Sequence, residues 1–277
     1  MLPNLIVIGA AKCGTTSLHE YLDEHPEISM SRQKELDFFV PEKSGDRDLA
    51  WYAAQFEDAP VRGESSPSYT AHPFYSGPPE RIAAVLPDVR LVYLVRDPIA
   101  RIVSHYVHRS GTYPEMGTLE ESLDHPDHGP WMIGLSRYWL QLERYLARFP
   151  AERILVVDSD ELRARRPETL SQIFAFAGVD PSFRSEGFEV VHTPGRTRTR
   201  RNPAGRALLG GLAKTLGPSR THRLVTSAPG ALKAPFRRML EPPVLGPAAR
   251  ERLEEELAPD TQRLRAHTGL AFGGWTV

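Results

Sequence analysis

The sequence predicts an α/β fold: a single P-loop-like domain with a central parallel sheet flanked by helices. Three largely apolar runs, residues 5–8, 90–95 and 154–157, indicate buried strands. Segments with apolar residues at helical spacing separate them, and strands that alternate with helices form parallel sheets with right-handed crossovers. At 277 residues the chain fits one such domain, so we expect residues 1–277 to form a single unit.

The expected elements follow one another as strands and helices in turn. Strands are predicted at residues 5–8, 61–64, 90–95 and 154–157, a short extended piece at 28–30, and helices at 15–24, 51–56, 79–86, 98–109, 135–149, 167–177 and 242–268. The first helix ends before Pro26, because the residue that precedes a proline disfavours the α conformation. Residues 111–130 are predicted to be a polar loop, because prolines and glycines interrupt them.

The segment after the first strand has the order of a phosphate-binding turn: strand, glycine-containing loop, helix start. A helix N-terminus offers unpaired N–H groups and a partial positive charge, and here Lys12 adds a full charge. The hydroxyls of Thr15, Thr16 and Ser17 add further donors. In a Walker loop, G-x-x-x-x-G-K-[ST], the lysine follows the second glycine, whereas here Thr15 follows Gly14. The segment predicts an anion site unlike that of an ATPase, with an ordinary strand-to-helix turn as the alternative.

A second anion-binding element is expected around Arg96. This arginine ends the strand at 90–95, at the carboxyl edge of the sheet where α/β proteins bind ligands. Ser104 follows eight residues later, about two helical turns on, so both side chains can converge on one anion. The alternative is an arginine that pairs with a local carboxylate.

Composition excludes several classes of function. The formal net charge of −1 argues against binding to nucleic acid. The single cysteine, Cys13, excludes an internal disulfide and favours a cytoplasmic location. No signal peptide and no apolar run of membrane-spanning length is visible, so no membrane span is expected. Histidines do not recur with cysteine or glutamate at metal-ligand spacing, so no metal site is expected, and no G-x-S-x-G elbow suggests a hydrolase.

Together the two anion elements resemble those of the sulfotransferases that use 3′-phosphoadenosine 5′-phosphosulfate (PAPS). The loop at residues 12–16 is similar to the family's 5′-phosphosulfate loop, and residues 94–104 to its 3′-phosphate motif; residues 150–160 resemble the segment that follows. The resemblance implies PAPS as donor, 3′,5′-adenosine bisphosphate as product and no metal. It assigns donor binding to Lys12, Cys13, Gly14, Thr15, Thr16, Ser17, Arg96 and Ser104.

A basic segment further along also resembles part of this family. Residues 197–203 are similar to a loop that closes over the adenosine and 3′-phosphate in the heparan-type enzymes. By this resemblance the candidate donor ligands are Arg198, Thr199, Arg200, Arg201 and Asn202. We expect the loop-rich residues 191–241 to close over the donor and acceptor sites, with a solvated basic loop as the alternative.

Within the family, the chain resembles the heparan-sulfate branch, which includes N-deacetylase/N-sulfotransferases and 3-O-sulfotransferases, as a soluble, bacterial-type member. The similar segment is Lys34-Glu35-Leu36-Asp37-Phe38-Phe39. In that branch its glutamate is the catalytic base, which implies this role for Glu35, while Lys12 stabilises the leaving phosphate. Asp37 stands where the branch often has histidine, so Asp37 is a second catalytic candidate. Ser65 stands where the branch often has lysine.

The expected function is transfer of a sulfuryl group from PAPS to a hydroxyl of a carbohydrate, a glycolipid or a secondary metabolite. The partner is then a glycan or small-molecule acceptor, and the oligomeric state is left open. A small-molecule P-loop kinase is one alternative, but it needs a lysine directly after Gly14 and an acidic Mg²⁺ ligand at a strand end. A module that binds polyanions through residues 196–206 is another, which the near-zero net charge disfavours.

Overall fold

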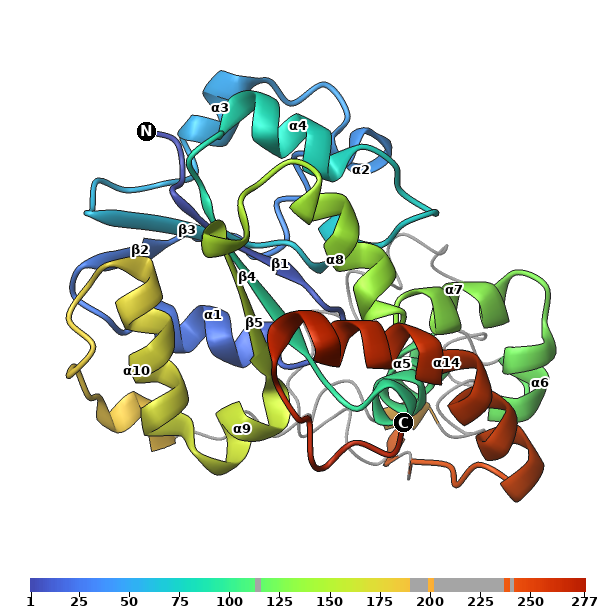
Figure 1. The fold of residues 1–277 in the computed structure, drawn as a ribbon. Coiled ribbons are helices and arrows are strands. Elements are labelled where there is room, and N and C mark those ends of the chain that lie inside the picture. Colours follow the sequence, from blue (N-terminus) through green and yellow to red (C-terminus); the bar gives the residue numbers. More distant parts are fainter. Residues whose placement is uncertain (113–115, 190–198, 202–236, 240–241) are drawn as a thin grey trace.

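The computed structural model describes residues 1–112, 116–189, 199–201, 237–239 and 242–277 (Figure 1). Its centre is a five-stranded sheet in the order β2-β3-β1-β4-β5, and every strand pair in it is parallel. The strands are β1 Leu5–Gly9, β2 Ile28–Met30, β3 Val61–Ser65, β4 Arg90–Val95 and β5 Ile154–Asp158. A parallel sheet between helices confirms the predicted α/β fold; four strands lie where the sequence predicts them, and the extended piece at residues 28–30 is the edge strand β2.

Strand β1 lies in the middle of the sheet and is buried along its whole length. It pairs with β3 through Leu5↔Gly63 and with β4 through Leu5↔Arg90. Its fully apolar run suits this place, because a central parallel strand is covered by helices on both faces. The shared register brings the carboxyl ends of β1, β3 and β4 to one edge of the sheet.

Helices cover both faces of the sheet. Figure 1 shows α1 and α10 on one face and α3, α4 and α8 on the other. The helices are α1 Thr15–Asp23, α2 Pro41–Ser44, α3 Leu49–Ala53, α4 Pro78–Val85, α5 Pro98–Thr112, α6 Leu119–Asp124, α7 His128–Gly134, α8 Tyr138–Leu146, α9 Ser159–Ala164, α10 Arg166–Ala177 and α14 Pro247–Thr268. Short 3₁₀ turns are η1 Pro67–Thr70, η3 Ala151–Arg153 and η4 Glu186–Glu189, and β6 Thr199–Arg201 pairs antiparallel with β7 Arg237–Met239. None of the described helices is both long and apolar enough to cross a membrane.

The predicted polar loop at 111–130 is wrong in part, since α6 and the start of α7 lie within it. Thr118 begins α6 with a capping box, in which its hydroxyl accepts from the Glu121 N–H and the Glu121 carboxylate accepts from the Thr118 N–H. Leu119 and Leu123 then bury their side chains against α14 residues such as Leu253. Tertiary burial therefore outweighs the turn-forming residues of this segment.

Other helix boundaries differ from the prediction at their ends. Helix α8 is shorter than the predicted 135–149, and α14 starts at Pro247 instead of residue 242. Helix α9 was not predicted; the Asp158 carboxylate that ends β5 begins it by accepting from the Asp160 N–H.

Two buried apolar clusters hold these layers together. The larger one surrounds the sheet, and the smaller one joins α5, α6, α7 and α14. The chain end adds a polar tie to the start of α5. There Asp97 accepts from the Ala100 N–H, and its second oxygen accepts from the N–H and the hydroxyl of Thr276, at 2.6 and 2.8 Å. The helix that follows Arg96 is thus fixed at its first turn.

Gly9 ends β1 against the side chain of Thr70. A Cβ atom added to Gly9 would lie 2.0 Å from the Thr70 Oγ1 atom, which itself donates to the Ile8 carbonyl at 3.2 Å. The close approach of β1 to η1 therefore requires glycine.

Gly9→Ala is expected to destabilise the protein by about 1–3 kcal/mol, the usual cost of overpacking a core. Urea unfolding followed by circular dichroism measures the free energy. In a Thr70→Ala background, which removes the clashing hydroxyl, the same change should cost clearly less. Equal costs in both backgrounds would contradict this explanation.

Candidate functional site

The loop between β1 and α1 has the geometry of an anion site. Lys12 and Gly14 both have left-handed backbones, with φ angles of 73° and 94°. Gly14 is the N-cap of α1 and provides no side-chain acceptor for the first N–H groups of the helix. Those groups are free to bind an anion, and the positive end of the helix dipole favours one. The residues present therefore fit a phosphate-bearing ligand.

Side chains of the loop divide into buried and accessible ones. Cys13 and Thr15 are buried, Lys12 and Ser17 are half-buried, and Thr16 is exposed. The Cys13 sulfur lies 3.6 Å from the Tyr138 hydroxyl, and burial raises the pKa of this thiol to about 11. Cys13 is therefore a neutral packing side chain at neutral pH and not a nucleophile.

Arg101 is a site residue that the sequence analysis missed. Its guanidinium is fully buried behind the loop, where Nη1 donates to the Ala11 carbonyl at 3.5 Å and to His105 Nδ1 at 3.1 Å. Nε donates to the Ser136 hydroxyl at 2.5 Å, and Nη2 to the Met132 carbonyl. No carboxylate among the described residues pairs with it. A buried, unneutralised cation makes the loop more positive, which favours an anionic ligand. The sequence signal that could have identified Arg101 is the helical spacing that places it on the buried face of α5.

Arg96 and Ser104 lie where the sequence predicts, at the end of β4 and within α5. Both are half-buried, and neither forms a hydrogen bond or ion pair with another described residue. The neighbouring carboxylate of Asp97 caps α5 and binds Thr276 instead. The alternative of an Arg96 neutralised by a local carboxylate is thus not seen among the described residues.

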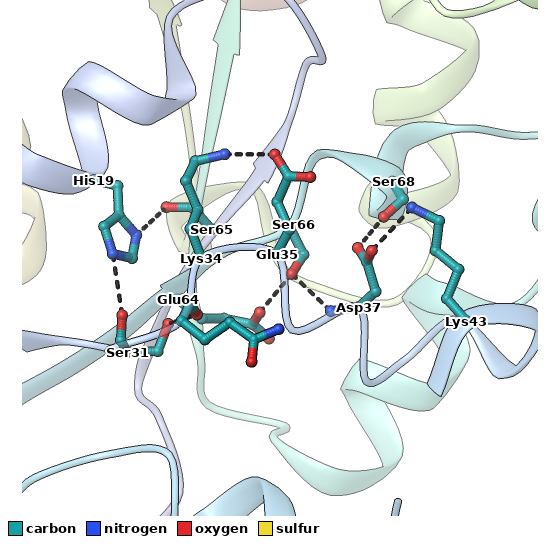
Figure 2. A network of polar contacts seen from close by, with 11 residues as sticks. His19, Ser31, Lys34, Glu35, Asp37, Lys43, Glu64, Ser65, Ser66 and Ser68 are labelled. Atoms are coloured by element: carbon teal, nitrogen blue, oxygen red, sulfur yellow. Dashed lines mark hydrogen bonds and ion pairs between the residues drawn. The ribbon is translucent and has the colours of Figure 1, made fainter. Parts of the chain in front are cut away.

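The segment that contains both candidate bases is strained and tied to β3. Glu35 and Asp37 have left-handed backbones, with φ angles of 63° and 51°, on either side of the fully buried Leu36. The Glu35 N–H donates to the Ser65 carbonyl at 3.0 Å, and the Asp37 N–H donates to the Ser66 hydroxyl at 3.1 Å (Figure 2). Left-handed residues other than glycine cost free energy and cluster at functional sites.

The two carboxylates of this segment have different surroundings. Asp37 is buried, and its oxygens accept from Lys43 at 2.9 Å and from the Ser68 hydroxyl (Figure 2). The Glu35 side chain is 54% exposed and accepts from Lys34 at 2.8 Å through one oxygen, and no other described residue donates to its second oxygen. Of the two candidate carboxylates, Glu35 is thus the more accessible to a ligand.

Glu35 and Lys12 share one electrostatic environment. Burial raises the pKa of Glu35, but the ammonium groups of Lys34, Lys43 and Lys12 outweigh it, and the pKa lies below its usual value. Burial also lowers the pKa of Lys12; Glu35 opposes this shift, and Lys34 adds to it. Burial and Lys12 lower the pKa of His108, while Glu35 raises it, so His108 faces the same groups. Lys12 and Glu35 are thus close enough to shift each other's pKa.

Ser65 occupies the position where the resemblance suggests a lysine. Its side chain is fully buried, and its hydroxyl lies 3.0 Å from His19 Nδ1, while His19 Nε2 lies 3.2 Å from the Ser31 carbonyl. Because a carbonyl only accepts, Nε2 carries the hydrogen and the neutral ring accepts from Ser65. A neutral Ser65–His19 pair therefore stands in place of a cation, and Lys34 is the lysine beside Glu35.

The remaining predicted ligands lie in or next to the basic segment. Arg198 and Asn202 fall outside the described residues. Residues 199–201 form β6, which pairs with β7 through Thr199↔Met239 and lies beside α5. Their roles stay predictions. In the described part of the chain, no group of three or more His, Cys, Asp or Glu side chains is arranged to hold a metal ion.

Fold and site together define an α/β protein with a candidate anion-binding loop at the carboxyl edge of its sheet. The family model described as "Sulfotransferase domain" matches residues 2–197, and the chain belongs to this family. A human protein named "Heparan sulfate glucosamine 3-O-sulfotransferase 3B1" is 30% identical over an alignment of 229 residues, which covers 73% of this chain and 57% of that protein. A Caenorhabditis elegans protein named "Bifunctional heparan sulfate N-deacetylase/N-sulfotransferase 1" is 27% identical over an alignment of 234 residues, which covers 79% of this chain and 26% of that protein.

These relatives confirm the predicted likeness to the heparan-sulfate branch. The chain spans little more than half of the human relative, since 57% of that protein is covered. Among solved structures, a sulfotransferase from Alicyclobacillus acidocaldarius has a TM-score of 0.72 at 23% identity, with 100% of both chains covered. This likeness shows that the two proteins share a fold.

Glu64 is a buried carboxylate next to this site. It is fully buried at the end of β3, and burial raises its pKa to about 7 although three hydroxyl groups donate to it. The native protein therefore holds a proton on Glu64 that an unfolded chain, with a pKa of 4.5, releases. Its contribution to stability is full below pH 4.5 and is lost as the pH rises through about 7.

Glu64→Gln should remove this pH dependence. Between pH 4.5 and 7 the wild type is expected to lose about 3 kcal/mol relative to the variant, from the difference between the two pKa values. Urea unfolding of both proteins at several pH values measures it. Parallel stability curves for the two proteins would show that Glu64 titrates normally.

Proposed function

We propose that the protein transfers a sulfuryl group from PAPS to a hydroxyl group of a carbohydrate or metabolite acceptor. The observation that supports it most is the shared site of Lys12 and Glu35, a cation of the anion loop and a carboxylate on a strained backbone. Family membership supports the same reaction. A base beside the cation that binds the leaving group is what hydroxyl-to-sulfur attack needs.

Each residue of the site has a distinct role in this proposal. PAPS, when bound, supplies the sulfuryl group and a phosphate leaving group whose negative charge grows as its bond to sulfur breaks. Lys12 and the N–H groups that start α1 bind that phosphate and stabilise the charge. Glu35 takes the proton of the acceptor hydroxyl as its oxygen bonds to sulfur. Arg96 and Ser104 bind the 3′-phosphate, and Lys34 holds Glu35 ionised before the reaction.

The names of the curated relatives favour a glycan among the possible acceptors. Two of them are heparan sulfate sulfotransferases by name, so we propose a carbohydrate hydroxyl as the first acceptor to test. A glycolipid or a secondary metabolite remains the alternative. The role of residues 191–241 in closing the site and the cytoplasmic location both stay predictions.

Nucleotide binding tests the donor site directly. Thermal shift and calorimetry with 3′,5′-adenosine bisphosphate, ATP-Mg²⁺ and RNA compare the three classes of ligand, because a ligand of the native state raises the melting temperature. We expect stabilisation by the bisphosphate. Stabilisation by ATP-Mg²⁺ alone would indicate a kinase, and by RNA alone a polyanion-binding module.

Arg96→Ala should reduce the preference for 3′,5′-adenosine bisphosphate over AMP by roughly 10- to 100-fold, the range for losing charge-assisted hydrogen bonds. Only the bisphosphate carries the 3′-phosphate that Arg96 is proposed to bind. Arg163→Ala is the matched control, since Arg163 is an exposed arginine in an ion pair with Asp160 on α9. An unchanged preference in Arg96→Ala would place the 3′-phosphate elsewhere.

Glu35→Gln should lower turnover by roughly 10²–10⁴-fold, the usual range for a lost general base, with donor affinity almost unchanged. Turnover is measured as release of 3′,5′-adenosine bisphosphate from saturating PAPS with a heparan oligosaccharide as acceptor. Asp37→Asn is the matched control and should cost much less, because Lys43 and Ser68 already occupy its oxygens. A larger loss in Asp37→Asn would reverse the two roles, and no loss in either would make His105 and His108 the next candidates.

A further inference from the structure

The proposed reaction does not use the buried Glu64 carboxylate. Its hydrogen bonds nevertheless connect it to the segment that contains the candidate base. Its Oε1 atom accepts from Tyr52 at 2.5 Å and from Tyr69 at 2.9 Å, and its Oε2 atom accepts from Ser66 at 2.6 Å. Burying such a group costs free energy even when hydrogen bonds satisfy it. The residues that its three donors contact indicate what the group does in the fold.

Ser66 connects Glu64 to the backbone of Asp37. A hydroxyl has one hydrogen, and the Ser66 hydroxyl gives it to the Glu64 carboxylate, so its lone pairs remain for other donors. The Asp37 N–H uses one of them at 3.1 Å (Figure 2). Once Glu64 is ionised, above its pKa of about 7, it can only accept, which fixes the direction of this chain of hydrogen bonds from the Asp37 N–H through Ser66 to Glu64.

The two tyrosines bind the next two residues of the same segment. The Tyr52 ring stacks on Phe38 with centroids 4.3 Å apart and planes 8° apart. The Tyr69 ring packs edge-on against Phe39 at 5.7 Å, and its hydroxyl accepts from the Phe39 N–H at 3.5 Å. Each donor to Glu64 thus contacts at least one residue of the run 37–39, which follows Glu35 in the sequence.

We propose that Glu64 is a positioning residue that, through Ser66, Tyr52 and Tyr69, holds the strained backbone of residues 35–39 in the conformation in which Glu35 acts as base. This proposal rests on the proposed role of Glu35. The left-handed conformations of Glu35 and Asp37 persist only where surrounding contacts over-determine them. The three side chains that donate to Glu64 supply part of those contacts. The Ser65 carbonyl, at the end of β3, adds another by accepting from the Glu35 N–H.

Ser66→Ala tests the proposal, because it removes the acceptor of the Asp37 N–H and leaves both tyrosine bonds to Glu64 in place. Hydrogen–deuterium exchange of the amides of residues 35–39 should become at least tenfold faster. Turnover of PAPS with a heparan oligosaccharide should fall at least tenfold, while the KM for PAPS and the affinity for 3′,5′-adenosine bisphosphate stay as in the wild type. Local loosening beside an intact donor site predicts this combination.

Ser122→Ala is the matched control. Ser122 is equally buried, and its hydroxyl donates to the Met116 carbonyl at 2.6 Å in another part of the fold. It should cost comparable stability and leave both the exchange of residues 35–39 and the turnover number unchanged.

Glu64→Gln is the conservative second variant in case Ser66→Ala does not fold. Its amide oxygen can still accept from Tyr52 and Tyr69, but its amide nitrogen donates to Ser66, which reverses that bond. It should show the same two effects as Ser66→Ala in weaker form.

The two possible failures can be told apart. Wild-type exchange at residues 35–39 in both variants would overturn the positioning role. So would a parallel loss of turnover and of bisphosphate affinity, which indicates general unfolding. If the wild-type protein does not turn over PAPS, the proposed function fails, while faster exchange in Ser66→Ala still supports the link from Glu64 to the segment.

Discussion

The parallel pairing of β1 between β3 and β4 is the constraint on which the site depends. Pairing through Leu5↔Gly63 and Leu5↔Arg90 makes three strands end at one edge of the sheet. The anion loop, Ser65 and Arg96 follow those three ends, although they lie far apart in the sequence. A slip of one residue in either pair would turn every side chain of the strand to the opposite face. It would also move Ser65 away from the Glu35 N–H that its carbonyl accepts.

This edge of the sheet gathers cations although the chain as a whole is nearly neutral, with a formal net charge of −1. Lys34 and Arg101 both lower the pKa of Lys12, and Glu35 opposes them. Arg101 is the extreme case, because its hydrogen bonds go only to neutral groups among the described residues. Such a site is costly when empty and is stabilised by an anionic ligand. The arrangement of these cations therefore favours an anionic ligand at this edge of the sheet.

The strands and the anion loop could be predicted because their signals are local. Three of the five strands are largely apolar runs of four to six residues, a pattern consistent with buried strands. The run from residue 111 to 130 shows the limit of this approach. Its glycines and prolines favour a loop, but Thr118 and Glu121 form a capping box, and the buried Leu119 and Leu123 complete a core with α14. That core joins residues more than a hundred positions apart, which a local pattern does not reveal. The capping box was a local signal for α6, but the glycines and prolines of the segment favoured the prediction of a loop.

The sequence by itself determined the family likeness, the anion loop with Lys12, Arg96 at a strand end, and the pair of candidate carboxylates. Which of those carboxylates is available was decided by tertiary structure alone. Asp37 turns to Lys43 and Ser68, while Glu35 keeps an exposed side chain beside Lys34. Arg101 and Glu64 gained their places in the same way, since both are buried ionisable groups that hydrogen-bond to side chains of other segments, such as Ser136 and Tyr52. The physical reason is that a side chain's charge state and freedom depend on burial and on neighbours, and strand register and helix packing choose those neighbours.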